Sequence, residues 1–373
     1  MKHLVIVILV ICQHKANTQT FELKTNARLV LGATKDRSAS VSAGDIDNDG
    51  DIDVIVANGR HWPEPNRILF NNGHGVFTVS KLLDNTSETS YAAELADFDG
   101  DGALDIAVGN DMAPNTLYLN DGNGDYTLAG TFGDLYAPTR NLKTADIDGD
   151  GDVDIIITNR GRENEICLNN GKGIFDKSIR FGTKDDSTID VDVADMNQDG
   201  HNDLILANRD GQQNYVYLND GKLGFDEKIP FGSGADGTRA VGVVDIDNDG
   251  YDDIITANIK GPNVIYFGSS ELSYERQVTF DHNTDNSYSL DFGDIDGNGT
   301  IDIAVGNSGQ PNHVFLNFDN GNTWKRIPLR NADAATYDIM IVDLNSDDRL
   351  DIIESNSEDV NYYYRNQLLT DED

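Results

Sequence analysis

Apolar residues along this chain gather in short runs, and glycine, asparagine and aspartate separate one run from the next. The first unit of this pattern places strand-like segments at residues 38–44, 52–57, 67–70 and 76–79. The turn at Asn71 has the Asn-Asn-Gly composition of a hairpin, since asparagine and glycine tolerate a positive φ. None of these segments has the length or the 3.6-residue period of a helix. The pattern therefore predicts an all-β fold built from units of four strands.

One acidic motif marks each unit, and its starting positions lie 49 to 52 residues apart. The seven copies are DIDNDGDID from Asp45, DFDGDGALD from Asp97, DIDGDGDVD from Asp146, DMNQDGHND from Asp195, DIDNDGYDD from Asp245, DIDGNGTID from Asp294 and DLNSDDRLD from Asp343. A period of about 50 residues with strand-like content is typical of β-propeller blades rather than of a helical solenoid. The sequence therefore predicts a single seven-bladed β-propeller domain over residues 21–373, with four-stranded blades.

The two ends of the chain predict how the ring closes. The last repeat supplies only three strands, the third at residues 361–365, so its fourth strand is missing. A strand-like segment at residues 21–31 precedes the first repeat and has no partner there. We expect this N-terminal segment to complete the seventh blade, because that arrangement leaves no free sheet edge in the circle.

Each acidic motif has the ligand pattern of a calcium loop. Carboxylates or amides stand at positions 1, 3, 5 and 9, and position 6 is glycine in six of the seven copies. Hard oxygen ligands at alternating positions, with a backbone carbonyl at position 7, suit Ca²⁺, and glycine permits the sharp turn. An EF-hand needs a glutamate at position 12, where the first copy has Val56 within a predicted strand. The motif is therefore a nine-residue loop closed by its own last aspartate.

The candidate metal ligands occupy positions 1, 3, 5 and 9 of every copy. They are Asp45, Asp47, Asp49 and Asp53; Asp97, Asp99, Asp101 and Asp105; Asp146, Asp148, Asp150 and Asp154; Asp195, Asn197, Asp199 and Asp203; Asp245, Asp247, Asp249 and Asp253; Asp294, Asp296, Asn298 and Asp302; and Asp343, Asn345, Asp347 and Asp351. The sixth copy lacks one charge at Asn298, and the seventh has Asp348 in place of glycine. We therefore expect about five to seven structural Ca²⁺ ions, on which folding should depend.

Three other polar columns recur in all seven repeats. A hydroxyl residue precedes each motif by seven positions: Ser38, Ser90, Thr139, Thr188, Thr238, Ser287 and Thr336. An asparagine follows each motif start by thirteen positions: Asn58, Asn110, Asn159, Asn208, Asn258, Asn307 and Asn356. A second asparagine opens each third strand: Asn66, Asn115, Asn164, Asn214, Asn263, Asn312 and Asn361. Because a ligand rarely touches seven blades alike, we interpret these columns as side-chain caps on loop backbones.

The repeated motif resembles the FG-GAP or VCBS repeat family, which includes the propeller of integrin α-subunits. The resemblance covers about residues 21–366, and Phe-Gly pairs at Phe132, Phe181 and Phe231 stand where that family's Phe-Gly falls. It implies a seven-bladed propeller with calcium in the loop between the first two strands of a blade. Adhesion propellers, lectins and some polysaccharide lyases share this architecture, so the resemblance implies no single activity.

Charge and the N-terminal residues narrow the class of protein and its location. Lys and Arg total 28 against 65 Asp and Glu, and the formal net charge of -37 excludes nucleic acid binding through counterion release. Residues 1–20 contain an apolar run at 4–11 after Lys2, which is typical of a secretory signal peptide too short to span a bilayer. The alternatives are lipidation at Cys12 or a buried first strand, and no other segment predicts a transmembrane span. We expect a secreted, extracellular protein, or a periplasmic or cell-surface one in a bacterium.

The face opposite the acidic loops differs among the repeats and carries basic and aromatic residues. The candidate ligand-binding residues there are Arg60, Trp62, Arg140, Arg160, Arg162, Arg209 and Arg239. Arginine pairs with carboxylate or sulfate and aromatic rings stack on sugars, so we expect a glycan, with an anionic one favoured, or an extracellular protein as the partner. The alternative is that these residues satisfy loop backbones or pair with nearby aspartates.

An enzyme is a second hypothesis for this face. A lyase acting on a uronate-containing glycan needs a base near the sugar and a group that neutralises the carboxylate. The candidate catalytic residues are His61, Tyr91, Tyr288 and Tyr337. No local catalytic motif supports a lyase, so we favour a binding module over an enzyme. A protein-adhesion or assembly module is the third hypothesis.

Overall fold

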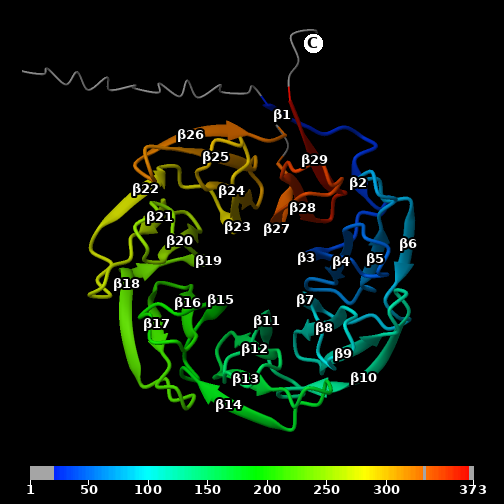
Figure 1. The fold of residues 1–373 in the computed structure, drawn as a ribbon, viewed down its shortest axis with the longest axis horizontal. Helices are drawn as coiled ribbons and strands as arrows, with labels where there is room; N and C mark the ends of the chain where they lie inside the picture. The colour runs from blue at the N-terminus through cyan, green and yellow to red at the C-terminus, as the bar shows by residue number, and fades with distance from the viewer. Residues whose placement is uncertain (1–20, 331–332, 369–373) are drawn as a thin grey trace, which may run out of the picture.

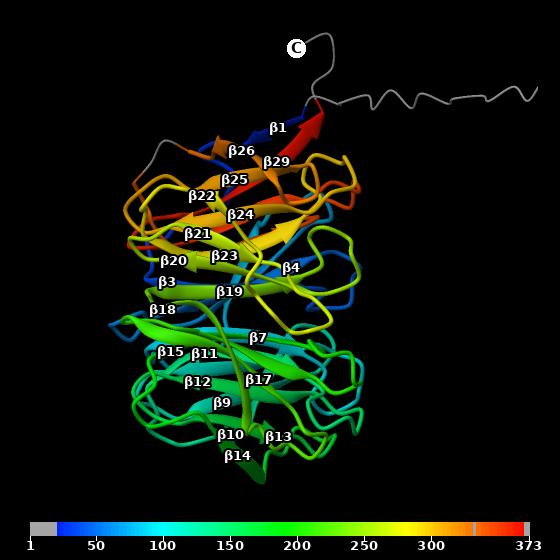
Figure 2. The same cartoon turned by 90° about the vertical axis from the view of Figure 1, so that its left-hand side faces the viewer.

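The computed structural model describes residues 21–330 and 333–368 and is a ring of seven antiparallel β-sheets around a central channel (Figure 1). Figure 2 shows the ring edge-on, with the strands running across its thickness. The prediction of an all-β, seven-bladed propeller is confirmed. Within the described part of the chain, no helix is long and apolar enough to cross a membrane. The predicted signal at residues 1–20, with Cys12, lies outside the described residues.

Each blade begins at the channel and adds its strands outwards in sequence order. The first three blades consist of β3 (Ser38–Gly44), β4 (Asp53–Asn58), β5 (Arg67–Phe70) and β6 (Val79–Leu82); β7 (Ser90–Ala96), β8 (Asp105–Asn110), β9 (Asn115–Asn120) and β10 (Tyr126–Phe132); and β11 (Thr139–Ala145), β12 (Asp154–Asn159), β13 (Asn164–Leu168) and β14 (Lys177–Phe181). The next three consist of β15 (Thr188–Ala194), β16 (Asp203–Asn208), β17 (Gln212–Leu218) and β18 (Glu227–Asp236); β19 (Thr238–Val244), β20 (Asp253–Asn258), β21 (Asn263–Tyr266) and β22 (Gln277–Asp281); and β23 (Ser287–Gly293), β24 (Asp302–Asn307), β25 (His313–Phe318) and β26 (Thr323–Pro328). The seventh contains β27 (Ala335–Val342), β28 (Asp351–Ser357) and β29 (Asn361–Leu368).

The second strand of a blade is buried along its whole length. In β4, all six residues are buried, because neighbouring blades cover both faces of the sheet. This is why the second strands are continuous apolar runs rather than alternating ones. The apolar clusters lie between blades, as where Ile205 and Val216 of the fourth blade pack with Val241 and Ile254 of the fifth. The hydrophobic core is therefore divided into wedges between adjacent blades.

The predicted closure of the ring is confirmed. Both β1 (Phe21–Lys24) and β2 (Val30–Leu31) pair antiparallel with β29, the last strand of the seventh blade. A turn between them divides the predicted segment into two short strands. Figure 1 shows the result, with the blue N-terminal strands beside the red C-terminal one. The seventh blade thus joins the two ends of the chain.

The fourth strand of the first blade begins later than the pattern predicts, at Val79 instead of residue 76. The reason is the preceding turn, in which Val76 N donates a hydrogen bond to the Asn71 side chain at 3.1 Å. Phe77 then packs edge-on against Tyr363 of the seventh blade, with ring centroids 5.5 Å apart. These residues therefore contact the neighbouring blade before the strand starts.

The three polar columns form a hydrogen-bonded belt. The Asn66 Oδ1 accepts a bond from the backbone N of Asn58 at 2.8 Å, so the side chain caps the loop as predicted. Its Nδ2 donates to the Ser90 hydroxyl of the second blade at 3.1 Å. The equivalent bond across the ring closure joins Asn361 to Ser38 at 3.0 Å. The capping interpretation is confirmed for the two asparagine columns. The hydroxyl column instead bonds asparagine side chains, as Ser38 does with Asn58 at 2.8 Å, and the second asparagine reaches the next blade.

Candidate functional site

The acidic loops connect the first and second strands of the blades and share one turn geometry. Position 6 has a φ of 88° to 94° at the six glycines and 62° at Asp348, which takes the same left-handed conformation. Position 4 has a positive φ as well, for example 57° at Asn48. Asparagine or glycine stands at position 4 in five of the seven copies. These residue types tolerate a positive φ, so they indicate in the sequence that position 4 is a second left-handed turn residue.

Carboxylates at positions 1 and 9 hold each loop to its sheet. In the first loop, the Asp45 carboxylate accepts a hydrogen bond from Asp49 N at 3.0 Å. Asp53, at position 9, accepts from Ile46 N at 3.3 Å and from Asn71 N at 2.7 Å. Burial raises the pKa of Asp53 to about 7. Position 9 therefore fixes the loop to the next hairpin, in addition to facing the other carboxylates.

Five loops bring three carboxylates close enough to hold one metal ion, with an oxygen of each member within 4.8 Å of the others. The groups are Asp45, Asp47 and Asp53; Asp97, Asp99 and Asp101; Asp146, Asp148 and Asp154; Asp245, Asp247 and Asp253; and Asp294, Asp296 and Asp302. The Oδ1 atoms of Asp47 and Asp247 are buried and have no hydrogen-bond partner among the described residues. Buried carboxylate oxygens without a donor fit a hard cation. The donor set is therefore compatible with a metal ion in these loops.

The fourth and seventh loops differ. Asn197 and Asn345 occupy position 3 there, and the described residues form no carboxylate triad in either loop. The sixth loop, expected to be weaker, has a triad because Asn298 stands at position 5 and the triad uses positions 1, 3 and 9. In the seventh loop, the Arg349 guanidinium contacts the Asp347 carboxylate. This arginine brings a positive charge of the protein itself into the loop.

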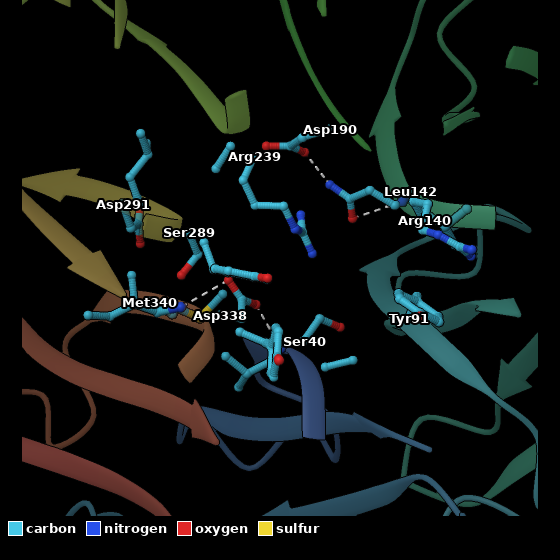
Figure 3. Close-up of a pocket in the computed structure, with 18 of the residues that line it drawn as sticks. Ser40, Tyr91, Arg140, Leu142, Asp190, Arg239, Ser289, Asp291, Asp338 and Met340 are labelled. Atoms are coloured by element: carbon cyan, nitrogen blue, oxygen red, sulfur yellow. Dashed lines mark hydrogen bonds between the residues drawn. The ribbon is translucent and has the colours of Figure 1, made fainter. Parts of the chain in front are cut away.

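The central channel contains a cavity of about 220 Å³ (Figure 3). The innermost strands of all seven blades line it, and each of them ends at its acidic loop. The first residues of these strands therefore lie at the opposite mouth of the channel. Tyr91, Arg140, Arg239, Tyr288 and Tyr337 stand there, each one position after the hydroxyl column. The structure thus brings together at one mouth five residues that the sequence spreads over five blades.

Two arginines and two tyrosines form a cluster at this mouth, called the mouth cluster below: Arg60, Arg239, Tyr288 and Tyr337. The guanidinium carbon of Arg60 lies 3.4 Å from the ring centroid of Tyr337 and 5.9 Å from that of Tyr288. The guanidinium of Arg239 lies 5.4 Å from the same Tyr288 ring. The two tyrosine rings meet edge to face, with centroids 4.9 Å apart. Two positive groups therefore approach one aromatic ring.

Gly59 positions Arg60 in this cluster. Gly59 has a φ of 103°, and a Cβ at this position would lie 2.2 Å from the carbonyl oxygen of Glu88. The N–H groups of Gly59 and Arg60 both donate to the carbonyl of Arg37, at 3.0 and 3.1 Å. Only glycine fits this turn, which places the Arg60 side chain over the first strand of the seventh blade.

The arginines of the mouth cluster lack anionic partners. Nε of Arg60 is buried without a hydrogen-bond partner, and no ion pair within residues 21–330 and 333–368 includes Arg60 or Arg239. Figure 3 shows Arg239 extending into the channel. Burial lowers the pKa of Arg239 to about 10; the Asp190 carboxylate opposes this effect and the charge of Arg60 adds to it. The cluster therefore holds two positive charges, neither of which makes a direct ion pair among the described residues.

The other predicted basic residues have carboxylate partners. The pairs are Arg140 with Asp111 (2.8 Å), Arg160 and Arg209 with Asp210 (2.7 and 3.3 Å), and Arg162 with Asp134 (3.5 Å). Arg140 also lies over the Tyr91 ring, 4.6 Å from its centroid. Trp62 is 65% exposed. Among the candidate arginines, Arg60 and Arg239 are therefore the ones whose charge is free to meet a ligand.

His61 lies beside Tyr91 at the same mouth. Its Nδ1 is 3.2 Å from the Tyr91 hydroxyl. Burial lowers the pKa of His61, and the charges of Arg60 and Arg140 add to this effect. Burial also raises the pKa of Tyr91. At neutral pH the pair is therefore a neutral imidazole hydrogen-bonded to a protonated phenol.

Below the mouth cluster, the channel carries carboxylates that the repeated motifs did not reveal. The Asp338 carboxylate accepts bonds from Ile339 N at 3.0 Å and from Val41 N of the next blade at 2.9 Å. Asp291 likewise accepts from Ile341 N of the seventh blade, at 2.6 Å. Burial raises the pKa of Asp338 to about 8. In the sequence, these two channel carboxylates could have been recognised as aspartates within an otherwise largely apolar first strand of a blade.

The fold is similar to that of several solved structures at low sequence identity. Two crystal structures of BBS1N in complex with ARL6DN, soaked with mercury and with lead, give TM-scores of 0.59 and 0.61 at 10% and 11% identity. They match 90% and 93% of this chain and 92% and 95% of the matched chain. The crystal structure of Raptor from Chaetomium thermophilum gives a TM-score of 0.59 at 13% identity, over 92% of this chain and 30% of that one. Such likeness shows the fold alone. No curated protein matches the sequence significantly.

A family model described as FG-GAP-like repeat matches the sequence five times. The matches lie at residues 45–108, 97–157, 146–206, 195–256 and 245–305. Each begins at an acidic motif and continues into the next unit, as the seven-unit reading of the sequence predicts. Because these matches together span more than half of the chain, the protein belongs to the FG-GAP-like repeat family.

Proposed function

We propose that this protein is an extracellular binding module that recognises an anionic ligand at the channel mouth, on a scaffold stabilised by calcium. The observation that carries the proposal is the mouth cluster, where Arg60 and Arg239 approach the same Tyr288 ring without a carboxylate partner among the described residues. The chain has a net charge of -37, and most of its arginines on this face are paired. Two arginines without an ion pair on so acidic a protein favour a role in binding an anion.

Physical chemistry supports an anion between the two arginines. Like charges held together in a partly buried site repel, and an anion placed between them removes the repulsion and gains charge-assisted hydrogen bonds. A guanidinium presents a planar fork that matches carboxylate or sulfate geometry. The tyrosines that hold the arginines in place add flat apolar surface, which suits a sugar ring or an aromatic side chain.

In this proposal, calcium stabilises the scaffold and does not contact the ligand. The acidic loops stand at the far end of the innermost strands, which have seven residues in β3. At about 3.3 Å per residue, the loops lie about 20 Å from the mouth cluster. The carboxylate triads and their partnerless oxygens support a structural ion there, not contact with the ligand. Extracellular calcium would keep such loops filled, and the apolar run at residues 4–11 supports secretion.

A glycan array probed in calcium with the native protein and with the double variant Arg60→Ala, Arg239→Ala tests the proposal. We expect the native protein to retain anionic glycans and the double variant to lose them. Arg160→Ala is the matched control, because Arg160 lies on the same face and is already paired with Asp210 at 2.7 Å. Unchanged binding by the double variant would contradict a site at the channel mouth. Capture of a protein partner without any glycan response would favour an adhesion module.

A uronate lyase is the second candidate, favoured by the contact of His61 Nδ1 with the Tyr91 hydroxyl at 3.2 Å. A neutral imidazole can accept the proton next to a sugar carboxylate that the arginines neutralise. The ultraviolet absorbance of an unsaturated product distinguishes the two functions. A lyase raises this absorbance on uronate polysaccharides and loses the activity in His61→Ala, whereas a pure binding module leaves the absorbance unchanged.

A further inference from the structure

The size of the channel limits what can enter it. The cavity below the mouth cluster measures about 220 Å³. Sites for drug-sized ligands measure about 300–1,000 Å³, so this cavity admits one ring-sized unit rather than a stretch of polymer. The cavity is lined by the innermost strands of all seven blades, so it runs along the axis of the ring. A longer ligand must therefore present one end to the channel.

The charges of the channel form two layers along this entry path. Arg239 and Arg60 define a positive layer at the mouth. Asp190, Asp291 and Asp338 define an acidic layer on the same strands, further from the mouth, where Glu94 and Lys143 also line the cavity. A carboxylate can stop between the arginines, but a second anionic unit would meet carboxyl groups and no free cation, since Lys143 at that depth pairs with Asp192 at 2.7 Å. The layers therefore select a ligand with a single anionic group at its leading end.

Below the positive layer, the cavity surface is mostly polar and offers hydrogen-bond acceptors. Asp338 uses its oxygens for Val41 N and Ile339 N, and carboxylate oxygens have further lone pairs for a ligand. Ser289 is 6% exposed, and its hydroxyl has no partner among the described residues. Such groups suit a ligand that donates several hydroxyl protons. A sugar does so, whereas an acidic peptide side chain offers no hydroxyl behind its carboxylate.

We propose that the channel mouth binds a single terminal uronic acid residue end-on, with its carboxylate between Arg60 and Arg239 and its hydroxyls directed to the acidic layer. This inference rests on the proposed function and deepens it, since it names the chemical class and the orientation of the ligand. Tyr288 and Tyr337 hold the two guanidinium groups in position for the carboxylate. The acidic layer offers a second uronate no unpaired cation, since Lys143 is held by Asp192.

Calorimetric titration of the full chain in calcium tests the proposal with small probes. The probes are methyl glucuronide, the matched neutral methyl glucoside, and N-acetylaspartate for a peptide source of carboxylate. We expect the glucuronide to bind at least about tenfold more tightly than either of the others, because a charge-assisted bidentate contact contributes about that much. Arg239→Gln and Arg60→Gln should each weaken the glucuronide by about tenfold or more, while Arg326→Ala, at an arginine already paired with Asp285 at 2.8 Å, leaves it unchanged. Thermal unfolding confirms that each variant is folded.

A pair of oligosaccharides tests the orientation. One carries a glucuronate at its non-reducing end, and the other carries the same glucuronate inside the chain, capped by glucose. We expect the first to bind like the methyl glycoside and the second to bind at least about tenfold more weakly. Equal binding of the two would overturn end-on recognition.

The remaining outcomes separate this inference from the proposed function. Equal affinity for glucoside and glucuronide would overturn the uronate assignment and the anion site with it, because a neutral sugar would then bind as well as a charged one. Tighter binding of N-acetylaspartate would overturn the uronate assignment alone, provided that this binding still needs Arg60 and Arg239. A folded Arg60→Gln variant that binds glucuronide as the native protein does would overturn both. Absence of binding by all three probes would overturn the uronate inference, and the glycan array then decides the proposed function.

Discussion

Asn164 illustrates how single polar residues hold the ring together. It is fully buried, its Oδ1 accepts a bond from Asn159 N at 2.8 Å, and its Nδ2 donates to Thr188 of the next blade at 3.1 Å. A buried group left without its partner costs about 1–3 kcal/mol. Each member of the belt therefore contributes to its own loop and to the junction between two blades.

Replacing Asn164 by Ala should lower the free energy of unfolding by about 2–4 kcal/mol, because two buried partners lose a hydrogen bond each. Urea denaturation at a fixed calcium concentration measures the loss. The control is Asn170→Ala, since Asn170 is exposed and its replacement should change stability by less than about 0.5 kcal/mol. Similar losses in both variants would contradict the role of the belt.

Asp338 gives a prediction about pH. Burial raises its folded pKa to about 8, above the ordinary value of 3.8, and the charges of Glu94 and Asp291 add to this effect. The folded protein therefore keeps the proton over a range in which the unfolded chain has lost it. The stabilisation is complete below about pH 4 and is lost as the pH rises towards about 8.

In calcium-saturated protein, we expect the stability of the native chain relative to Asp338→Asn to fall as the pH rises from 5 to 8, by up to about 1.4 kcal/mol per pH unit. Asparagine cannot ionise, so the variant lacks this component of the pH dependence. Denaturation curves of both proteins across this range provide the measurement. Parallel pH profiles would show that Asp338 does not titrate there.

At the scale of elements, the acidic loop and its neighbouring strands act as one unit. Two left-handed turn residues fold the loop back, and the aspartate at position 9 ties it to the hairpin of the same blade. Five loops then assemble a carboxylate triad. The seventh keeps the backbone shape through Asp348 but pairs Asp347 with Arg349. The same backbone therefore supports loops with different charge, and with different expected affinity for a cation.

Arg349→Ala should increase the number of bound calcium ions by about one per chain, because it frees the Asp347 carboxylate in the seventh loop. Native mass spectrometry in calcium counts the ions. Arg326→Ala serves as the control, since Arg326 pairs with Asp285, which is not in an acidic loop. An unchanged ion count in a folded Arg349→Ala protein would show that the arginine does not compete with the metal.

At the scale of the whole molecule, the net charge of -37 and the concentration of aspartate at one end of the channel work against folding. Bound divalent cations offset this repulsion, and each site adds about 2.7 kcal/mol when free calcium exceeds its Kd a hundredfold. The ring shape makes the effect collective, because each blade packs against two neighbours and the seventh blade joins both ends of the chain.

Removing calcium with a chelator should therefore lower the Tm by many degrees, and added calcium should restore it, since several sites contribute together. Scanning calorimetry measures the shift. Raised sodium chloride should recover only part of the loss, because it screens repulsion without binding the loops. A Tm that does not respond to the chelator would contradict a structural role for the ion.

The sequence by itself determined the fold of this protein and the position of the acidic loops. Seven motifs about 50 residues apart specify seven blades, since each blade is made of local hairpins whose strands follow one another in the chain. Even the closure by residues 21–31 follows from counting strands, because an unpaired edge at each end of the chain indicates a partner.

Only the tertiary structure decided which arginines are free and what lies beneath them. Arg60 and Arg239 are far apart in the sequence, and nothing local distinguishes them from Arg140 or Arg160, which find Asp111 and Asp210. The ring brings Arg60 over Tyr337 and places the acidic layer under both free arginines. Pairing and burial depend on contacts between different blades, and a repeat pattern describes each blade alone. The physical reason is that a charge is neutralised by whatever lies near it in space.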